Sequence, residues 1–292
     1  MRSLPSRYII LLSGLILFFS LFIFFINCMM YHYRGNNYFP DNVPLLALIL
    51  VLFYLGLTLI FAKHSKPCLI GRELLYFFCI MSVIAFATNA IQLTPFTPID
   101  KQITWLEKMV HIDMDRIVRW TNLYPRFKNF LGIIYDNLTY QMSIIPLLVI
   151  LTCRFHLLRE YYFLLLCTTL IGFSFYYFFP TTAPASMSNG AYFSTAQIAT
   201  GLKFQQIHHH IIPTTNDGGL IALPSFHVIW AMLCVYLIRE WKIACVLLAI
   251  LNLFLIASCV LLGWHYPTDL IGSAIVLIIS FYLLQKCKNN LG

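Results

Sequence analysis

Two histidines and one aspartate are the residues of this chain whose types and spacing best suit catalysis. His227 follows Leu-Pro-Ser-Phe, and His265 begins the stretch His-Tyr-Pro-Thr-Asp, which ends at Asp269. A spacing of four places two side chains on one face of a helix, one turn apart. Asp269 can therefore hold one ring nitrogen of His265 and leave the other nitrogen free to act as a nucleophile.

Each histidine stands at the edge of a hydrophobic segment, close to the predicted boundary between membrane and water. A histidine that only hydrogen-bonds to a loop is the simpler interpretation of such a position. The presence of Asp269 beside His265, and of Pro-Ser-Phe before His227, favours the catalytic interpretation.

The composition indicates an integral membrane protein. Hydrophobic residues make up 60% of the 292 residues and charged residues only 10%, whereas soluble domains carry about a quarter charged residues. The hydrophobic runs are about 20 residues long, the length of a membrane-spanning helix and not of a barrel strand. The net charge of +8 requires no nucleic-acid partner, because membrane proteins gather Lys and Arg on cytoplasmic loops. We therefore expect membrane lipids as partners.

The hydrophobic runs predict an all-α fold, a polytopic transmembrane helical bundle of about eight spans. The first run is too long for the core of a signal peptide and lacks a small-residue cleavage site, so we expect it to be retained. Residues 1–66 then hold two N-terminal spans, and residues 67–288 hold the six spans of a catalytic domain. The expected spans are 1–30, 44–62, 75–93, 130–152, 161–179, 225–239, 243–262 and 266–284.

Eight spans place both termini on one side of the membrane. Most basic residues then face the cytoplasm, as the positive-inside rule requires; Arg34 and the bases of residues 94–128 are exceptions. The cytoplasmic set is Arg2, Arg7, Lys63, Lys66, Arg72, Arg154, Arg159, Arg239, Lys242, Lys286 and Lys288. The candidate site therefore faces the extracytoplasmic side, with His227 and His265 both on it.

Two segments between the spans carry further predictions. Residues 94–128 alternate apolar and charged positions at helical spacing, which predicts an amphipathic helix lying in the interface. That helix either tethers the fold or contacts lipid headgroups through its bases, Arg116, Arg119, Arg126 or Lys128. Residues 181–222 form a long polar connection of the kind that carries function.

A polar stripe is predicted in the fourth span. An intramembrane Asp is costly and is a functional candidate by default. Asp136, Tyr140 and Ser143 share a helical face, so we expect a stripe that points into the bundle, with Asp136 in contact with substrate. A buried structural hydrogen-bond network is the alternative.

The pair of motifs Pro-Ser-Phe-His and His-Tyr-Pro-Thr-Asp resembles the type 2 phosphatidic acid phosphatase/haloperoxidase superfamily over roughly residues 130–284. Together with Phe-Pro-Thr-Thr-Ala-Pro at residues 179–184, the motifs look most like the inositol phosphorylceramide synthase branch. The resemblance implies a six-helix lipid phosphatase-like core. It also implies that His265 attacks a lipid phosphate to form a phosphohistidine, that Asp269 orients it, and that His227 is the general acid and base. Ser225 would then cap its helix and help to bind phosphate.

The chain departs from the family pattern at the phosphate-binding bases. The family's S-R-x5-H-x3-D signature has Ser258 in place, but Cys259 stands where the Arg is expected, and the K-x6-R-P signature is absent. Another base must then balance the phosphoryl oxygens. The candidates are Lys203, the histidines at 208–210 and the bases of residues 94–128, and we expect Lys203 ahead of the histidines. The three histidines are adjacent in sequence and do not form a metal motif. We predict no metal and no cofactor.

The predicted function is transfer of a phosphoryl headgroup from a membrane lipid to an alcohol acceptor through a phosphohistidine. Hydrolysis of phosphatidic acid-type or isoprenoid phosphates is the alternative within the family. A transporter that uses Asp136 and Glu73, or an inactive scaffold, is the alternative outside it. The sequence leaves the donor, the acceptor and the oligomeric state open.

Overall fold

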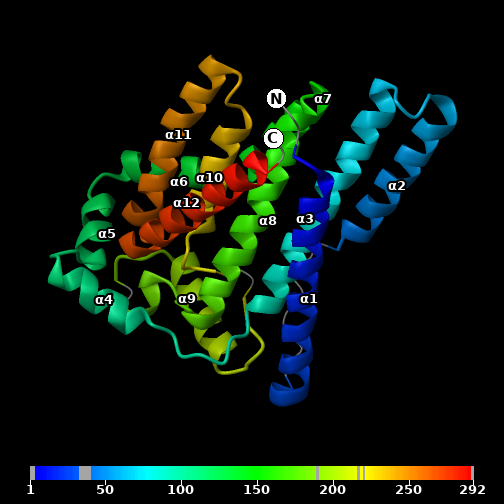
Figure 1. The fold of residues 1–292 in the computed structure, drawn as a ribbon. Helices are drawn as coiled ribbons and strands as arrows, with labels where there is room; N and C mark the ends of the chain where they lie inside the picture. Colours follow the sequence, from blue (N-terminus) through cyan, green and yellow to red (C-terminus); the bar gives the residue numbers. More distant parts are fainter. Residues whose placement is uncertain (1–3, 33–40, 189–190, 216–217, 220, 291–292) are drawn as a thin grey trace.

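The computed structural model describes residues 4–32, 41–188, 191–215, 218–219 and 221–290, and these residues are helical or lie in connections between helices. Within them, six helices are long and apolar enough to cross a membrane. This confirms the polytopic helical bundle (Figure 1). The six are α1 (Ser6–Tyr31), α2 (Val43–Ile60), α3 (Lys66–Ile91), α8 (Phe155–Phe178), α11 (Lys242–Leu261) and α12 (Pro267–Asn289).

The two other predicted spans differ from simple membrane-crossing helices. The fourth span is divided into α6 (Pro125–Asp136) and α7 (Leu138–Leu151), which meet at a bend of 41°. The sixth is α10 (Phe226–Leu237), which has only 12 residues and is therefore about 18 Å long. A hydrocarbon core is about 30 Å thick, so α10 is shorter than a typical membrane-spanning helix.

Helix α10 lies at the centre of the bundle. It packs against α7, α8, α11 and α12, and Ile229, Leu233 and Leu237 along its length are completely buried. It begins directly after Ser225 and ends before Arg239. The first turn of this helix is therefore surrounded by protein.

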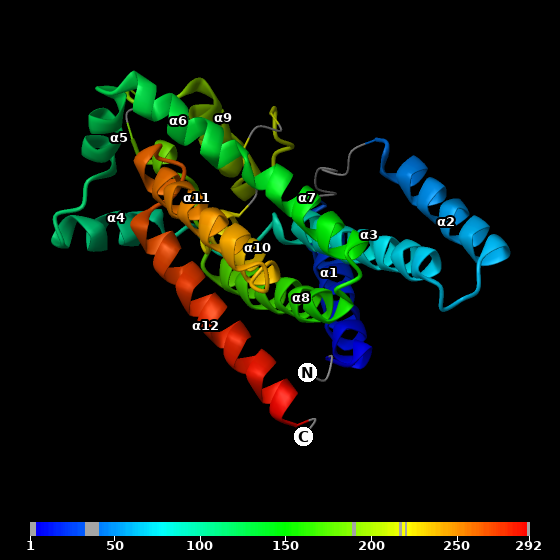
Figure 2. The same ribbon diagram turned by 90° about the horizontal axis from the view of Figure 1, so that it is seen from above.

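The N-terminal helices form a lateral layer of the bundle. Helix α1 packs against α3 and α8, while α2 packs chiefly against α3 and stands apart from α10–α12 in Figure 2. Helix α3 begins at Lys66, earlier than the predicted span, so Glu73 lies inside it. Glu73 is fully buried and accepts a hydrogen bond from Arg159 of α8. This ion pair joins α3 of the N-terminal layer to α8 of the central bundle.

The predicted interfacial helix over residues 94–128 is helical and amphipathic, but it is broken. The chain forms α4 (Asp100–Met109) and α5 (Met114–Asn122), and the last residues of the segment begin α6. The buried face of α4 carries two acids, Asp100 and Glu107, as well as Ile103. Its acids therefore point toward the protein and not toward solvent.

The connection over residues 181–222 also contains helical structure that the sequence analysis did not predict. It holds a short 3₁₀ helix, Pro184–Ser186, and α9 (Thr195–His208). Ser194 and Gln197 form a capping box at the start of α9, a sequence signature of a helix N-terminus. The expected long polar connection is therefore partly helical.

The polar stripe of the fourth span points outward. Asp136, Tyr140 and Ser143 do share one face, but all three are exposed. The opposite face, with Leu138, Gln141 and Met142, is the buried one. The expectation that the stripe points into the bundle was wrong, because the apolar residues of α7 face the core.

The two termini lie side by side, and α4, α5, α6 and α9 lie on the opposite side of the molecule (Figures 1 and 2). Near the termini, Glu160 of α8 pairs with Arg239 at 2.7 Å and with Lys288 of α12 at 2.5 Å. Tyr236 donates to the same carboxylate at 2.5 Å. These bases belong to the predicted cytoplasmic set; Arg2 and Arg34 lie outside the described residues.

We predict that Glu160→Ala destabilises the fold strongly. The substitution leaves Arg239 and Lys288 together without a counter-charge, and breaking a buried ion pair costs about 3–5 kcal/mol. Thermal unfolding of the purified chain in detergent measures the loss. Glu240→Ala is the matched control, because Glu240 pairs with Arg154 and His156 at a more exposed position, where such pairs contribute about 0–1 kcal/mol. Equal losses in the two variants would contradict the prediction.

Candidate active site

The imidazole of His265 is held through one nitrogen. Its Nδ1 lies 3.1 Å from the carbonyl oxygen of Ala222 and 3.1 Å from Oδ2 of Asp269. A carbonyl oxygen only accepts hydrogen bonds, so Nδ1 carries the hydrogen and donates it. The lone pair of the neutral ring is therefore on Nε2, as a nucleophile requires.

A tight turn between α11 and α12 delivers His265 to this position. The carbonyl of Cys259 accepts the backbone N–H groups of Trp264 at 3.0 Å and His265 at 2.9 Å. Gly263 within the turn has φ +84°, a conformation that glycine adopts without the steric cost of a Cβ. The turn therefore depends on the glycine directly before Trp264.

Two carboxylates stabilise the start of α12. Oδ2 of Asp269 accepts the backbone N–H of Tyr266 at 3.0 Å in addition to the His265 ring. Oε1 of Glu107 accepts the N–H of Thr268 at 3.1 Å and its hydroxyl at 2.8 Å. Negative groups are favourable at a helix N-terminus, where N–H groups lack partners. Helix α4 thus fixes the end of α12 that carries the site.

The two acids of α4, Asp100 and Glu107, are buried. Asp100 accepts the N–H of Thr182 at 3.1 and 2.9 Å through its two oxygens. Burial raises the pKa of the Asp100 and Glu107 carboxyls, and their hydrogen bonds to Thr182 and Thr268 act in the opposite direction. Asp100 therefore joins the Pro-Thr-Thr stretch after α8 to α4.

His227 lies beside His265 although 38 positions separate them in the sequence. It occupies the first turn of α10, and the two ring centroids are 5.7 Å apart. Both rings line one small cavity of about 30 Å³, to which Thr200 and Phe204 of α9 also contribute. That space holds one or two water molecules. Both histidines can therefore contact the same small group of a substrate bound in this cavity.

His227 is part of an aromatic stack. The ring of Tyr135 is stacked on it at a centroid distance of 4.3 Å, and Trp264 is stacked parallel to Tyr135 at 5.6 Å. The Tyr135 hydroxyl lies 3.4 Å from Nδ1 of His227. A hydroxyl both donates and accepts, so it can remain the partner of this nitrogen whether or not His227 is protonated.

Burial determines the charge of the candidate nucleophile. It lowers the pKa of His265 to about 4, while the hydrogen bond to the Ala222 carbonyl acts in the opposite direction. His265 lies in the turn between α11 and α12, outside both helices. Its ring is therefore neutral near pH 7, which is the nucleophilic form.

The three other predicted site residues lie in different places. Ser225 is the N-cap residue of α10, but its fully buried side chain makes no capping hydrogen bond. Lys203 of α9 is fully buried, and its Nζ donates to the carbonyl of Gly218 at 3.1 Å. Asp136 lies at the end of α6 and lines a separate, open groove. The structure thus brings together the two histidines and Asp269. Lys203 is adjacent in sequence to Phe204, which lines the cavity, and Asp136 lies outside the cavity.

The position of the missing arginine is completely buried. Cys259 is 0% exposed, and its thiol lies 3.4 Å from the carbonyl of Leu255. Ser258 is also buried and donates to the same carbonyl at 2.6 Å. Both side chains are directed back to their own helix.

Sequence reasoning missed Tyr135, Trp264, Asp100 and Glu107. Tyr135 and Trp264 directly precede Asp136 and His265, and aromatic residues at span ends are ordinarily explained by the interface. The two acids belong to an amphipathic pattern whose charged face was expected to meet solvent. Their contacts with Thr182 and Thr268 connect segments far apart in the chain, which a local pattern does not reveal.

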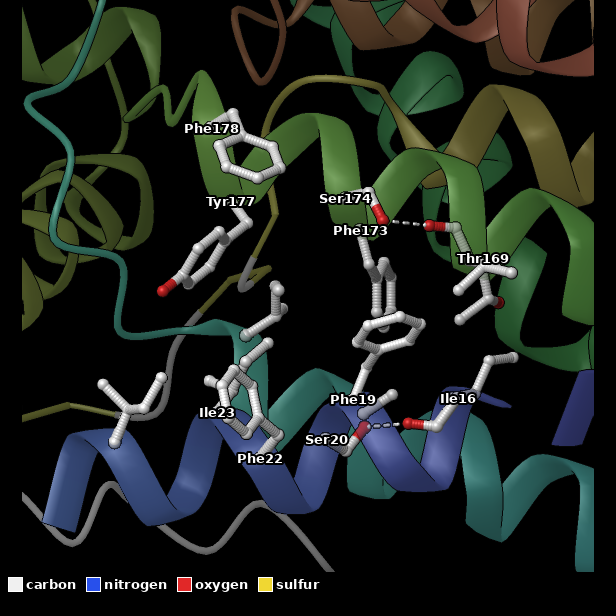
Figure 3. A pocket seen from close by; sticks show the side chains of 14 residues that line it. Ile16, Phe19, Ser20, Phe22, Ile23, Thr169, Phe173, Ser174, Tyr177 and Phe178 are labelled. Carbon is white, nitrogen blue, oxygen red and sulfur yellow. Dashed lines mark hydrogen bonds between the residues drawn. The ribbon is translucent and has the colours of Figure 1, made fainter. Parts of the chain in front are cut away.

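A larger cavity, of about 370 Å³, lies between α1, α3 and α8 and carries no such chemistry. Figure 3 shows Phe22 and Ile23 of α1 facing Tyr177 and Phe178 of α8 across it. Its polar groups are hydroxyls, and it contains no histidine or acid. In the part of the chain that the structure describes, no group of three or more His, Cys, Asp or Glu side chains could hold a metal ion.

Comparison with known families decides the affiliation of the chain. The family model of the PAP2 superfamily matches residues 101–283. The chain belongs to the PAP2 superfamily. The match begins in α4 and ends in α12, so it includes both histidines, Asp269 and every residue of the aromatic stack, whereas α1, α2 and α3 precede it. Searches of curated proteins and of solved structures returned no match.

Membership in the PAP2 superfamily supports a lipid enzyme of the phosphatase or phosphotransferase type. The long apolar helices agree with an integral membrane protein. The boundary between residues 1–66, with two N-terminal spans, and residues 67–288, the catalytic domain, stays a prediction. The paired histidines of this PAP2 chain lie at the end of the molecule away from its termini.

We predict that Gly263→Ala reduces activity while the bundle persists. A Cβ there would lie 2.6 Å from Cγ2 of Val118 and 2.7 Å from Cε1 of Phe193, and the left-handed conformation costs about 1–2 kcal/mol more for alanine. A shift of about 1 Å in His265 can cost about 100-fold in rate. Turnover of ³²P-labelled phosphatidic acid measures the effect. Gly56→Ala in α2, where a Cβ also meets nothing within 4 Å, is the control, and equal activity in both variants would contradict the prediction.

We also predict an acid-dependent loss of stability that depends on His265. Its pKa in the fold, about 4, lies below the ordinary value of 6.5, so the unfolded chain takes up the proton first. Stability should therefore fall as pH drops from about 6.5 to about 4, by up to about 1.4 kcal/mol per pH unit. Unfolding temperatures across this range should fall less steeply in His265→Asn. The exposed His111 supplies the control variant His111→Asn, which should keep the slope of the unaltered chain.

Proposed function

We propose that this protein transfers a phosphoryl headgroup from a membrane lipid to an alcohol through a phosphohistidine on His265. The observation that carries the proposal is the pair of acceptors on Nδ1 of His265, Ala222 O and Asp269 Oδ2, both at 3.1 Å. They leave Nε2 as the nucleophilic atom in a cavity that His227 also lines. This is the geometry that nucleophilic catalysis with an adjacent acid and base requires.

The first step forms the phosphoenzyme. Nε2 of His265 attacks phosphorus, an N–P bond forms, and the P–O bond to the lipid alcohol breaks. His227, which takes up a proton when the anionic phosphate lies beside it, gives its Nε2 proton to the leaving oxygen. Asp269 stabilises the positive charge that His265 acquires. Tyr135 remains on Nδ1 of His227 throughout the step.

The second step reverses the first with a different alcohol. The acceptor hydroxyl gives its proton to His227 as its oxygen attacks phosphorus, and the N–P bond to His265 breaks. His265 returns to its neutral form and His227 to its protonated form. Water in place of the acceptor would give hydrolysis.

Transfer is favoured over hydrolysis by the size of the cavity. About 30 Å³ of space admits little water, and exclusion of water protects a reactive intermediate from hydrolysis. The likeness of residues 179–184 and of the two histidine motifs to the inositol phosphorylceramide synthase branch supports the same choice. Hydrolysis of a lipid phosphate stays the second candidate, because the family includes both reactions.

Lys203 is our candidate for the base that balances the phosphoryl charge. It is fully buried, and its neighbours Thr200 and Phe204 line the catalytic cavity. Ser225 and the N–H groups at the start of α10 would add to this binding. A buried ammonium group close to a phosphate can replace part of the charge that Cys259 does not supply.

We further propose that the site opens to the extracytoplasmic side. The termini and the ion pairs of Arg239 and Lys288 lie together, and basic residues collect on the cytoplasmic side. The helices around the site, α4, α5 and α9, lie at the other end of the molecule (Figure 1).

A transporter receives less support. Glu73 is ion-paired with Arg159, and Asp136 is exposed on the outer face of α6. The two acids do not line a common path among the residues that the structure describes. An inactive scaffold would not require the arrangement around His265.

We predict that incubation with ³²P-labelled phosphatidic acid or phosphatidylinositol labels His265 with acid-labile phosphate. His265→Ala should abolish both labelling and turnover. Asp269→Asn should slow turnover by between about 10²-fold and 10⁴-fold, because Ala222 O still fixes the ring tautomer. An unlabelled, fully active chain would refute the phosphohistidine. Inorganic phosphate as the sole product, whatever alcohol is supplied, would show that the enzyme is a phosphatase instead.

A further inference from the structure

The catalytic cavity lies next to a much larger groove. The groove has a volume of about 490 Å³, is open to the outside, and is formed by α6, by the region from Ser194 to Gln197 and by the end of α11. Two side chains line both spaces, Tyr135 and Trp264. They are the parallel aromatic stack that ends on His227. One layer of aromatic rings therefore separates the groove from the histidines.

The catalytic cavity must enlarge before a reaction can take place. Its 30 Å³ suffices for one or two waters, and a phosphoryl group together with an attacking oxygen needs more. Thr200, Phe204 and Ala222 on its walls are buried. On the side of the groove, Tyr135 and Trp264 are only half-buried, and at the opposite edge Ile221 is half-buried and Gly219 exposed. Movement of the two rings joins the cavity to the groove without disturbing the core.

The lining of the groove is largely apolar and includes Ile133 and Leu262, but it also holds a few polar groups that suit the polar end of a small molecule. Asp136 and Asn129 face it and are exposed, and they offer a carboxylate and an amide, groups that accept from and donate to hydroxyls. Lys128, also on its wall, donates to Asn122 at 2.6 Å. Gln197 is already engaged with the carbonyl of Leu262 at 2.7 Å. An uncharged, hydroxyl-bearing molecule suits this mixed lining better than a phosphate, which Asp136 would repel.

We propose that the groove admits the alcohol acceptor, and that the Tyr135–Trp264 stack is the partition it displaces to reach the phosphoenzyme. This inference rests on the proposed function. The acceptor oxygen forms the new P–O bond, the N–P bond to His265 breaks, and the acceptor proton goes to Nε2 of His227. Tyr135 is a positioning residue in this scheme: its hydroxyl holds Nδ1 of His227, while its ring closes the cavity to water.

The test fills the groove without touching the partition. A Cβ at Gly132 meets nothing within 4 Å, so Gly132→Trp places a large side chain in the groove. Glycerol serves as the probe acceptor and ³²P-labelled phosphatidic acid as the donor, with the full-length chain in lipid vesicles. We expect the KM for glycerol to rise about tenfold, the effect of losing one good pocket contact, while the rate of His265 labelling is retained.

Gly14→Trp is the matched control, because Gly14 of α1 is exposed and its Cβ also meets open space. It should change neither quantity. An unchanged KM for glycerol in Gly132→Trp would overturn the inference. Labelling slowed as strongly as transfer would overturn it too, since it would assign the groove to the donor. No labelling in the unaltered chain would instead refute the proposed function itself, and the inference with it.

A second variant tests the partition. Trp264→Ala removes one ring of the stack, so water should compete better and the share of inorganic phosphate among the products should rise. Trp264→Phe keeps an aromatic ring and should restore the original ratio of transfer to hydrolysis. A merely structural Trp264 would lower both products together and leave their ratio unchanged, which would contradict the partition.

Discussion

The site depends on one oxygen atom, Oδ2 of Asp269. It accepts from the His265 ring at 3.1 Å and from the backbone N–H of Tyr266 at 3.0 Å. The first bond sets the direction of the imidazole, and the second begins α12. Because a single buried carboxylate fulfils both functions, the His265 ring and the helix that follows it keep a fixed relation. The enzyme proposal needs that relation, since Nε2 must meet phosphorus from one side.

Three short helices, α4, α5 and α9, support this arrangement. Glu107 of α4 supplies the hydrogen bonds to Thr268 that Asp269 does not make, and Val118 of α5 packs against the glycine turn at Gly263. Helix α9 contributes a wall of the cavity. These three helices thus hold the turn between α11 and α12 in place, together with the start of α12.

The sequence predicted those features that a periodic pattern or a short spacing encodes. Hydrophobic length gave the long spans, and the spacing of four between His265 and Asp269 gave their contact. The sequence did not predict the bend between α6 and α7 or the short length of α10. An apolar run shows where a helix can form and not how far it continues. Tyr135 and Glu107 reach the site through contacts between distant segments, which one sequence without relatives does not reveal. The inward direction assigned to Asp136 was wrong because an acid in an apolar run can also lie at the mouth of a groove.

The brevity of α10 has a consequence for the lipid. A helix of about 18 Å that ends near the bases predicted to be cytoplasmic would leave His227 well below the opposite headgroup layer of a bilayer with the usual core of about 30 Å. The substrate phosphate would then have to descend from a region of high dielectric constant into one of low dielectric constant, and shed much of its hydration. Either the surrounding leaflet becomes thinner there, or the protein draws single lipids out of their layer.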